Sequence, residues 1–133
     1  MSASAHGGLA GEIFDLPGGA RALFTGRAHG NLSSVGGEGA EAGLKARESL
    51  RAAIGVQRLA RGYQVHGTVI CAVVPGGDGT VLRGVLPGGP LEAIPRDGER
   101  QPDVEADGHA VAVKGVGAMV MAADCVPVVL GAE

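Results

Sequence analysis

Aromatic residues and long apolar runs are both scarce in this sequence. Two Phe, one Tyr and no Trp occur among its 133 residues. A hydrophobic core must therefore consist of Val, Leu, Ile and Ala, and we expect it to be thin, because aromatic side chains bury large areas in most cores. No apolar run approaches the roughly 20 residues that a helix needs to cross a bilayer. The N-terminus also lacks the basic and apolar regions of a signal peptide.

Cysteine is equally rare. The two cysteines, Cys71 and Cys125, lie far apart in the sequence and form no disulfide framework. Reduced thiols are typical of cytoplasmic proteins, so we predict a cytoplasmic location. The formal net charge is −3, and Lys and Arg are scattered, so no basic patch for nucleic acid is apparent. We therefore expect neither nucleic acid nor a membrane as a partner, and the sequence leaves the oligomeric state open.

Glycine, in contrast, is abundant. It occupies 25 of the 133 positions without a collagen-like period. This abundance predicts many turns and short secondary-structure elements. An apolar content of 45% with little net charge is typical of a globular chain rather than a disordered one. The length is that of one ordinary domain, so we predict a single domain over residues 1–133.

Short strands separated by turns, and one helix, are expected along the chain. From β-rich apolar runs bounded by turn residues, we predict strands at 9–14, 21–25, 59–65, 68–74, 81–86, 109–113, 118–122 and 126–130. The segments 109–113 and 118–122 are expected to form a hairpin. A helical pattern covers 40–54, with apolar residues such as Leu44 near one face and Arg47 on the solvated face. A core strand so near the last residue predicts that the chain is a fragment of a longer protein.

Polar residues interrupt two apolar segments. The first interruption is Asp124 followed by Cys125, and the second is His66 within Gln-Val-His-Gly. Buried strands are short continuous apolar runs, so polar residues inside them are out of place. Such departures from a local pattern occur mostly at functional sites, and we interpret Cys125 and His66 as two halves of one site. Taken singly, each of these residues has a simpler explanation. Cys125 would be an inert buried thiol, His66 a structural histidine, and Asp124 a side chain that caps a bent backbone.

Two other motifs are rejected. The segment 103–108 (D-V-E-A-D-G) matches the start of an EF-hand calcium loop. The twelfth position of such a loop must be a bidentate carboxylate, and here it is Lys114, so calcium is not expected. None of the glycine clusters completes the phosphate-binding loop of a nucleotide-binding protein, which excludes phosphate sites of those kinds.

Four motifs together resemble one known family. They are L-F-T-x-R with G-N-L-S at 23–33, Q-V-H-G at 64–67, E-A-D-G at 105–108 and A-D-C-V-P-V-V-L at 123–130. Their order resembles the YfiH-type laccase-domain family, which is labelled multicopper polyphenol oxidase and was later recognised as purine nucleoside phosphorylases. The resemblance covers nearly the whole chain. It implies an α+β fold with mixed β-sheets layered with helices, of which 1–133 is the N-terminal portion.

The resemblance implies a zinc site of one cysteine and two histidines. His66 and Cys125 match two of these ligands and, with Asp124, are the candidate catalytic residues. The third ligand lies in an H-x-G-W-R-G segment that is expected beyond residue 133, and the other three histidines do not match it. Three protein ligands leave one position for water or substrate, and zinc lowers the pKa of bound water towards neutrality. Copper is the alternative metal.

The same resemblance suggests which residues bind the substrate. Arg27 is the candidate contact for phosphate, since a guanidinium group neutralises an anion through charge-assisted hydrogen bonds. Asn31 and Gln64 are candidates for orienting the polar groups of a nucleoside. The chain departs from the family at two places, because the arginine loop at 26–29 is shortened and Ala-Arg at 46–47 replaces Asn-Arg.

Four functional hypotheses follow. The leading one is a zinc-dependent purine nucleoside phosphorylase that acts on adenosine, inosine or methylthioadenosine and also deaminates adenosine. The second is a copper-dependent polyphenol oxidase, although the four scattered histidines are too few for several copper centres. The third is a metal-free cysteine hydrolase with Cys125 as nucleophile and His66 as base. The fourth is an inactive truncated product, in which two ligands hold zinc weakly.

Overall fold

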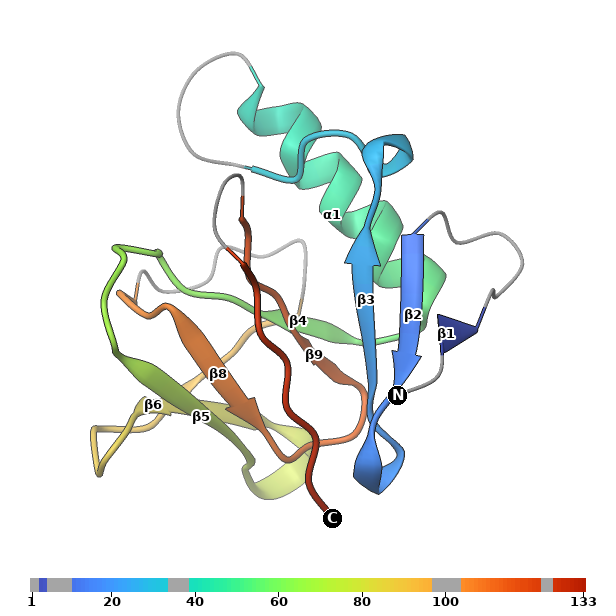
Figure 1. The fold of residues 1–133 in the computed structure, drawn as a ribbon. Helices are drawn as coiled ribbons and strands as arrows, with labels where there is room; N and C mark the ends of the chain where they lie inside the picture. Colours follow the sequence, from blue (N-terminus) through green and yellow to red (C-terminus); the bar gives the residue numbers. More distant parts are fainter. Residues whose placement is uncertain (1–2, 5–10, 34–38, 97–103, 123–125) are drawn as a thin grey trace. The chain divides into compact units, whose positions relative to one another are not determined.

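The computed structural model of the protein describes residues 3–4, 11–33, 39–96, 104–122 and 126–133. Within these residues it has the predicted α+β arrangement, with mixed sheets, one α-helix and no closed barrel (Figure 1). The chain forms two compact units: unit 1 comprises Met1–Ala53 and Met121–Glu133, and unit 2 comprises Ile54–Val120. Among the described residues, no helix is long and apolar enough to cross a membrane.

Unit 1 contains a three-stranded antiparallel sheet in the order β1-β2-β3. Its strands are β1 (Ala3–Ser4), β2 (Gly11–Asp15) and β3 (Arg21–Thr25). The turn η1 (Pro17–Gly19) joins β2 to β3, and Gly18 in it has a φ of 75°, which glycine adopts without a steric penalty. The rings of Phe14 and Phe24 pack edge to face across the two strands, with centroids 5.6 Å apart. The strand predicted at 21–25 is confirmed as β3, and that predicted at 9–14 corresponds to β2, although residues 9–10 lie outside the described residues.

The helix α1 (Ala40–Ile54) has the predicted bounds, but a different face of it is buried. Its buried residues, spaced as one helix face, are Gly43, Arg47 and Leu50. Leu44, which was predicted on the apolar face, is 49% exposed, whereas Arg47, which was predicted in solvent, is 5% exposed. The prediction failed because a preceding loop packs its backbone against Gly43 and accepts a hydrogen bond from Arg47.

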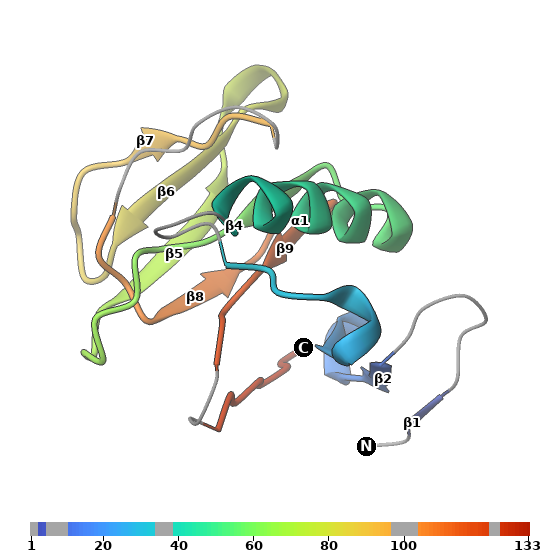
Figure 2. The same cartoon turned by 90° about the horizontal axis from the view of Figure 1, so that it is seen from above.

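Unit 2 is built from a four-stranded mixed sheet and a two-stranded parallel sheet. The larger sheet has the order β7-β6-β5-β8, in which β5 pairs antiparallel with β6 and parallel with β8 (Figure 2). Its strands are β5 (Ile70–Pro75), β6 (Val81–Val85), β7 (Glu92–Ala93) and β8 (Gly108–Val111). The smaller sheet consists of β4 (Arg58–Ala60) and β9 (Val116–Ala118). The core of unit 2 is aliphatic, as predicted, and its central cluster is Ala60, Val73, Val81 and Ile94.

The hairpin predicted from 109–113 and 118–122 is wrong. β8 pairs with β5 and β9 pairs with β4, both in parallel. The connecting turn docks elsewhere, because the carbonyl of Gly115 accepts the N–H of Gln57 at 2.7 Å and brings β9 beside β4. Long-range parallel pairing leaves no local turn signal, so the sequence pattern favoured the simpler hairpin.

The strand predicted at 126–130 is also wrong. This segment has no regular secondary structure. Val126 is 86% exposed and Leu130 is 89% exposed, so the apolar run does not form a buried strand within unit 1. An apolar run alone predicts a strand only if a neighbour pairs with it, and none of the described strands does so here.

Candidate functional site

His66 lies in a tight loop of unit 2, between the isolated bridge of Tyr63 with Glu105 and the start of β5. Its φ is 57°, in the left-handed region that residues with a β-carbon rarely adopt. His66 is exposed to solvent. An unusual backbone conformation at an exposed histidine is the kind of local strain that clusters at functional sites.

The carboxylate of Asp107 accepts hydrogen bonds from three consecutive N–H groups of this loop. The N–H of His66 donates to Oδ1 at 2.9 Å, that of Gly67 donates to Oδ2 at 2.9 Å, and that of Val65 donates to Oδ1 at 3.2 Å. These bonds, that of Gly67 above all, hold the pKa of the Asp107 carboxyl below its ordinary value, because N–H donors favour the ionised form. The Q-V-H-G and E-A-D-G motifs therefore form one structural site.

Backbone pairing brings the two motifs together. The N–H of Tyr63 donates to the carbonyl of Val104 at 2.7 Å, and the N–H of Ala106 donates to the carbonyl of Tyr63 at 3.0 Å. The N–H of Asp107 then donates to the carbonyl of Val69 at 3.1 Å. These three bonds enclose the loop from both sides, so its position depends on the start of β8.

Asp107 is missing from the predicted site residues, although the sequence held a signal for it. Its motif, E-A-D-G, is one of the four that carry the family resemblance. The only chemistry that its pattern suggested was calcium binding, which Lys114 excludes. The motif acts instead as an acceptor of backbone hydrogen bonds, a role that becomes visible only when residues about 40 positions apart are placed together.

Two predicted substrate-binding residues lie in a surface loop of unit 1. Arg27 begins the turn η2 (Arg27–His29) and is exposed, which suits a contact with a soluble anion. Asn31 is also exposed, and its Oδ1 accepts the N–H of Ser33 at 2.9 Å, which closes a local turn. The structure thus places Arg27 and Asn31 in the same short loop, as their spacing predicts.

The helix α1 anchors this loop. Arg47 donates from Nε to the carbonyl of Leu32 at 2.5 Å and from Nη2 to the sulfur of Met121 at 3.4 Å. A β-carbon at Gly43 would lie 1.7 Å from the carbonyl oxygen of Ser33, so the loop backbone rests directly on the helix. The position of Asn31 therefore depends on Gly43 and Arg47, one helical turn apart.

The remaining predicted site residues divide between unit 2 and the part of the chain that is not described. Gln64 is half-buried in the same loop as His66, so the structure brings these two residues together. Asp124 and Cys125 lie outside the described residues. The convergence of His66 and Cys125 on one ion therefore remains a prediction.

A second group of ionisable residues occupies the inner face of the larger sheet in unit 2. Cys71 and Arg83 are buried, and His109 is the parallel partner of Cys71 in the register of β5 and β8. Burial raises the pKa of the Cys71 thiol, so this cysteine is an unreactive thiol rather than a nucleophile. Arg83 donates from Nη1 to the carbonyl of Arg61 at 2.5 Å. This group is structural, and a small cavity of about 150 Å³ adjoins it.

His109 makes folding stability depend on pH. Its two ring nitrogens are buried without a hydrogen-bond partner among the described residues, and burial, followed by the charge of Arg83, lowers its pKa from 6.5 to about 4. The unfolded chain takes up a proton below about pH 6.5, whereas the folded imidazole stays neutral to about pH 4, so stability falls between these values. We expect wild type to lose about 1–2 kcal/mol relative to His109→Leu between pH 7 and pH 4.5, after allowance for partial solvent screening.

Urea unfolding at the two pH values measures this difference. Both proteins lose stability in acid through their carboxylates, so only the difference between them reports on the histidine. Parallel pH profiles for wild type and His109→Leu would show that the imidazole titrates normally in the folded protein.

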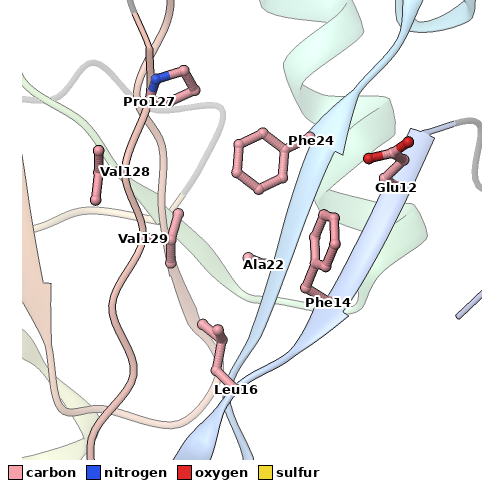
Figure 3. Close-up of a pocket in the computed structure, with 8 residues that line it drawn as sticks. All are labelled: Glu12, Phe14, Leu16, Ala22, Phe24, Pro127, Val128 and Val129. Carbon is pink, nitrogen blue, oxygen red and sulfur yellow. The ribbon is translucent and has the colours of Figure 1, made fainter. Parts of the chain in front are cut away.

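An apolar pocket of unit 1 is a poor candidate for phosphate binding. It has a volume of about 380 Å³. Side chains of β2 and β3, including Phe14 and Phe24, lie across it from Pro127, Val128 and Val129 (Figure 3). Its single charged residue is Glu12, which would repel an anion.

His66 is the one predicted metal ligand that lies within the described residues. Among those residues, no group of three or more His, Cys, Asp and Glu side chains is close enough to hold a metal ion. His66 nevertheless has what a first ligand needs, an exposed imidazole on a backbone that hydrogen bonds hold in place. The donor type is suitable for zinc and for copper alike.

Comparison with known protein families identifies a family for most of the chain. A family model described as multi-copper polyphenol oxidoreductase laccase matches residues 18–133. The matched region contains all four motifs, including the loop of His66 and its acceptor Asp107. No curated protein and no solved structure matches the chain.

Proposed function

Because this chain belongs to the multi-copper polyphenol oxidoreductase laccase family, we propose that it acts as a zinc-dependent purine nucleoside phosphorylase on adenosine, inosine or methylthioadenosine, with adenosine deaminase activity. The family membership agrees with the resemblance to YfiH-type laccase domains and indicates an enzyme of that group. The observation that supports the proposal most directly is the exposed His66 in a loop whose three successive N–H groups, those of Val65, His66 and Gly67, donate to one carboxylate.

Each candidate residue has a role in this reaction. His66 and Cys125 would hold zinc, which supplies an activated water for deamination or orients phosphate for attack at the anomeric carbon. Arg27 neutralises the phosphate anion through its planar guanidinium group. Asn31 and Gln64 orient the nucleoside by hydrogen bonds. In phosphorolysis a phosphate oxygen forms the new bond to the anomeric carbon, and the base leaves with the electrons of the glycosidic bond and takes up a proton.

Release of adenine that requires phosphate is the test of this function. We expect the zinc-loaded protein to convert adenosine to adenine when phosphate is present and to form no adenine when it is absent. Arg27→Ala should raise the KM for phosphate about tenfold or more while binding of the nucleoside changes little, because the lost charge contacts only the anion. Chromatography of the reaction mixture measures both effects. Adenine formation without phosphate would indicate a hydrolase, and no adenine in either case would contradict the proposal.

Copper-dependent phenol oxidation is the second candidate, and the description of the matching family favours it. A thiolate with imidazoles can bind copper as well as zinc. This function predicts that the copper-loaded protein consumes oxygen when a dimethoxyphenol is added. Oxygen uptake that exceeds that of free copper, together with no release of adenine, would replace the first proposal by the second.

A further inference from the structure

The loop of His66 forms a concave group of backbone donors. Val65, His66 and Gly67 direct successive N–H groups towards the same carboxylate, and the left-handed φ of His66 makes this possible. Successive N–H groups in such a turn form a nest for an anion, in which their partial positive charges converge. Without an acceptor these groups would repel one another and turn towards water. The conformation of the loop therefore depends on the carboxylate of Asp107.

The carboxylate is itself fixed by regular structure. Asp107 directly precedes β8, whose first residue, Gly108, pairs with Ile70 of β5. The residue before it, Ala106, is 1% exposed. A residue that lies between a buried residue and a paired strand, with its own N–H bonded to the carbonyl of Val69, has little freedom to move, so its side chain can impose its position on the more exposed loop.

We propose that Asp107 is the positioning residue for His66. Its carboxylate holds the loop at 65–67 in the metal-binding conformation before the ion binds. The inference rests on the proposed function, because it takes His66 to be a metal ligand. Asp107 does not need to touch the ion. It holds the backbone from which the imidazole projects, and so reduces the conformational entropy that the loop would otherwise lose when the metal binds.

Two substitutions test this role. Asp107→Asn keeps the shape of the side chain but turns one acceptor oxygen into a donor, and Asp107→Ala removes both oxygens. We expect zinc affinity to fall about tenfold or more in each, as is typical when a group that orients a ligand is lost. Asp78→Asn is the control, because Asp78 is an exposed aspartate in the separate turn between β5 and β6 and shares the left-handed φ of 57° with His66, and this variant should bind zinc like wild type.

Amide hydrogen exchange in the metal-free protein provides the second measurement. We expect the amides of Val65, His66 and Gly67 to exchange about tenfold faster or more in the Asp107 variants, while amides of β5 and β6 keep their protection and show that unit 2 remains folded. Wild-type zinc affinity in Asp107→Asn, or unchanged exchange at the three amides, would overturn the inference and leave the proposed function standing. A wild-type protein that binds no zinc would contradict both the proposed function and the metal-positioning role, and exchange that is fast only in the Asp107 variants would then identify Asp107 as a structural clamp.

Discussion

Replacing Gly43 with alanine is expected to destabilise the protein by about 2 kcal/mol or more, although helix propensity predicts the opposite. In an isolated helix, alanine is more favourable than glycine by about 1 kcal/mol. Here the added β-carbon would lie 1.7 Å from the carbonyl oxygen of Ser33 and 2.6 Å from its carbonyl carbon. These are backbone atoms, so the whole loop must move away, and overpacking of this kind costs about 1–3 kcal/mol or more.

The displacement also breaks a second interaction. When the loop moves, Arg47 loses its hydrogen bond to the carbonyl of Leu32. Loss of this one hydrogen bond from a buried charged group costs about 1–3 kcal/mol further, even though Arg47 still donates to the sulfur of Met121. The two penalties together exceed the gain in helix propensity.

Gly39→Ala is the matched control for this substitution. Gly39 directly precedes α1, and a β-carbon placed there meets no atom within 4 Å. We expect Gly39→Ala to leave the free energy of unfolding unchanged or slightly raised, because alanine reduces the freedom of the unfolded chain. Urea unfolding of both variants measures the difference. Equal stabilities for Gly43→Ala and Gly39→Ala would show that the loop does not rest on the helix.

Replacing His66 with alanine is expected to abolish stoichiometric zinc binding. Loss of a residue that only orients a ligand weakens metal binding by about 10–100-fold, and loss of the ligand itself should cost more. Release of adenine should fall by at least about 100-fold, since the reaction as proposed requires the metal. Metal analysis of the purified protein and titration with zinc measure the first effect, and the phosphate-dependent assay measures the second.

The control for this substitution is His29→Ala. His29 ends η2 in unit 1, where its Nδ1 accepts the N–H of Gly26 at 3.2 Å, so it already has a local role. It does not match any ligand position of the family, and its loss should leave the zinc content unchanged. Cys125→Ala should reproduce the zinc loss of His66→Ala. A His66→Ala protein that retains one zinc per chain would remove the basis of the proposed metal site.

Local signals in the sequence explain which parts of the fold could be predicted. The turn Leu-Pro-Gly-Gly separates β2 from β3, and the bounds of α1 follow from its periodicity and from Gly55, whose φ of 78° suits a helix terminus. The pairing of β5 with β8 and of β4 with β9 depends instead on contacts between distant residues. The burial of Arg47 could not be predicted from a local pattern either, because a loop rather than an apolar layer covers that face of α1.

The candidate site was predictable to a similar extent. His66 was singled out because it interrupts an apolar segment, and Gln64 was named as a candidate from the family resemblance; both remain predictions as site residues. Asp107 was missed because its function is to bind backbone N–H groups, and a sequence pattern does not show which backbone groups lack a partner. A local sequence pattern therefore identifies a polar residue such as His66 within an apolar segment. Its hydrogen-bonding partner Asp107, about 40 positions away, is identified only from the structure.

The position of Asp107 also has a consequence for biosynthesis. The ribosome delivers the loop at 64–67 about 40 residues before the carboxylate that holds it, which at roughly 5–20 residues per second is a delay of several seconds. The parallel strand β8 that carries the carboxylate cannot join β5 earlier than this. During translation, the nascent chain therefore exposes His66 on an unrestrained segment, and the hydrogen bonds from Asp107 that fix the loop form only after most of unit 2 has left the exit tunnel.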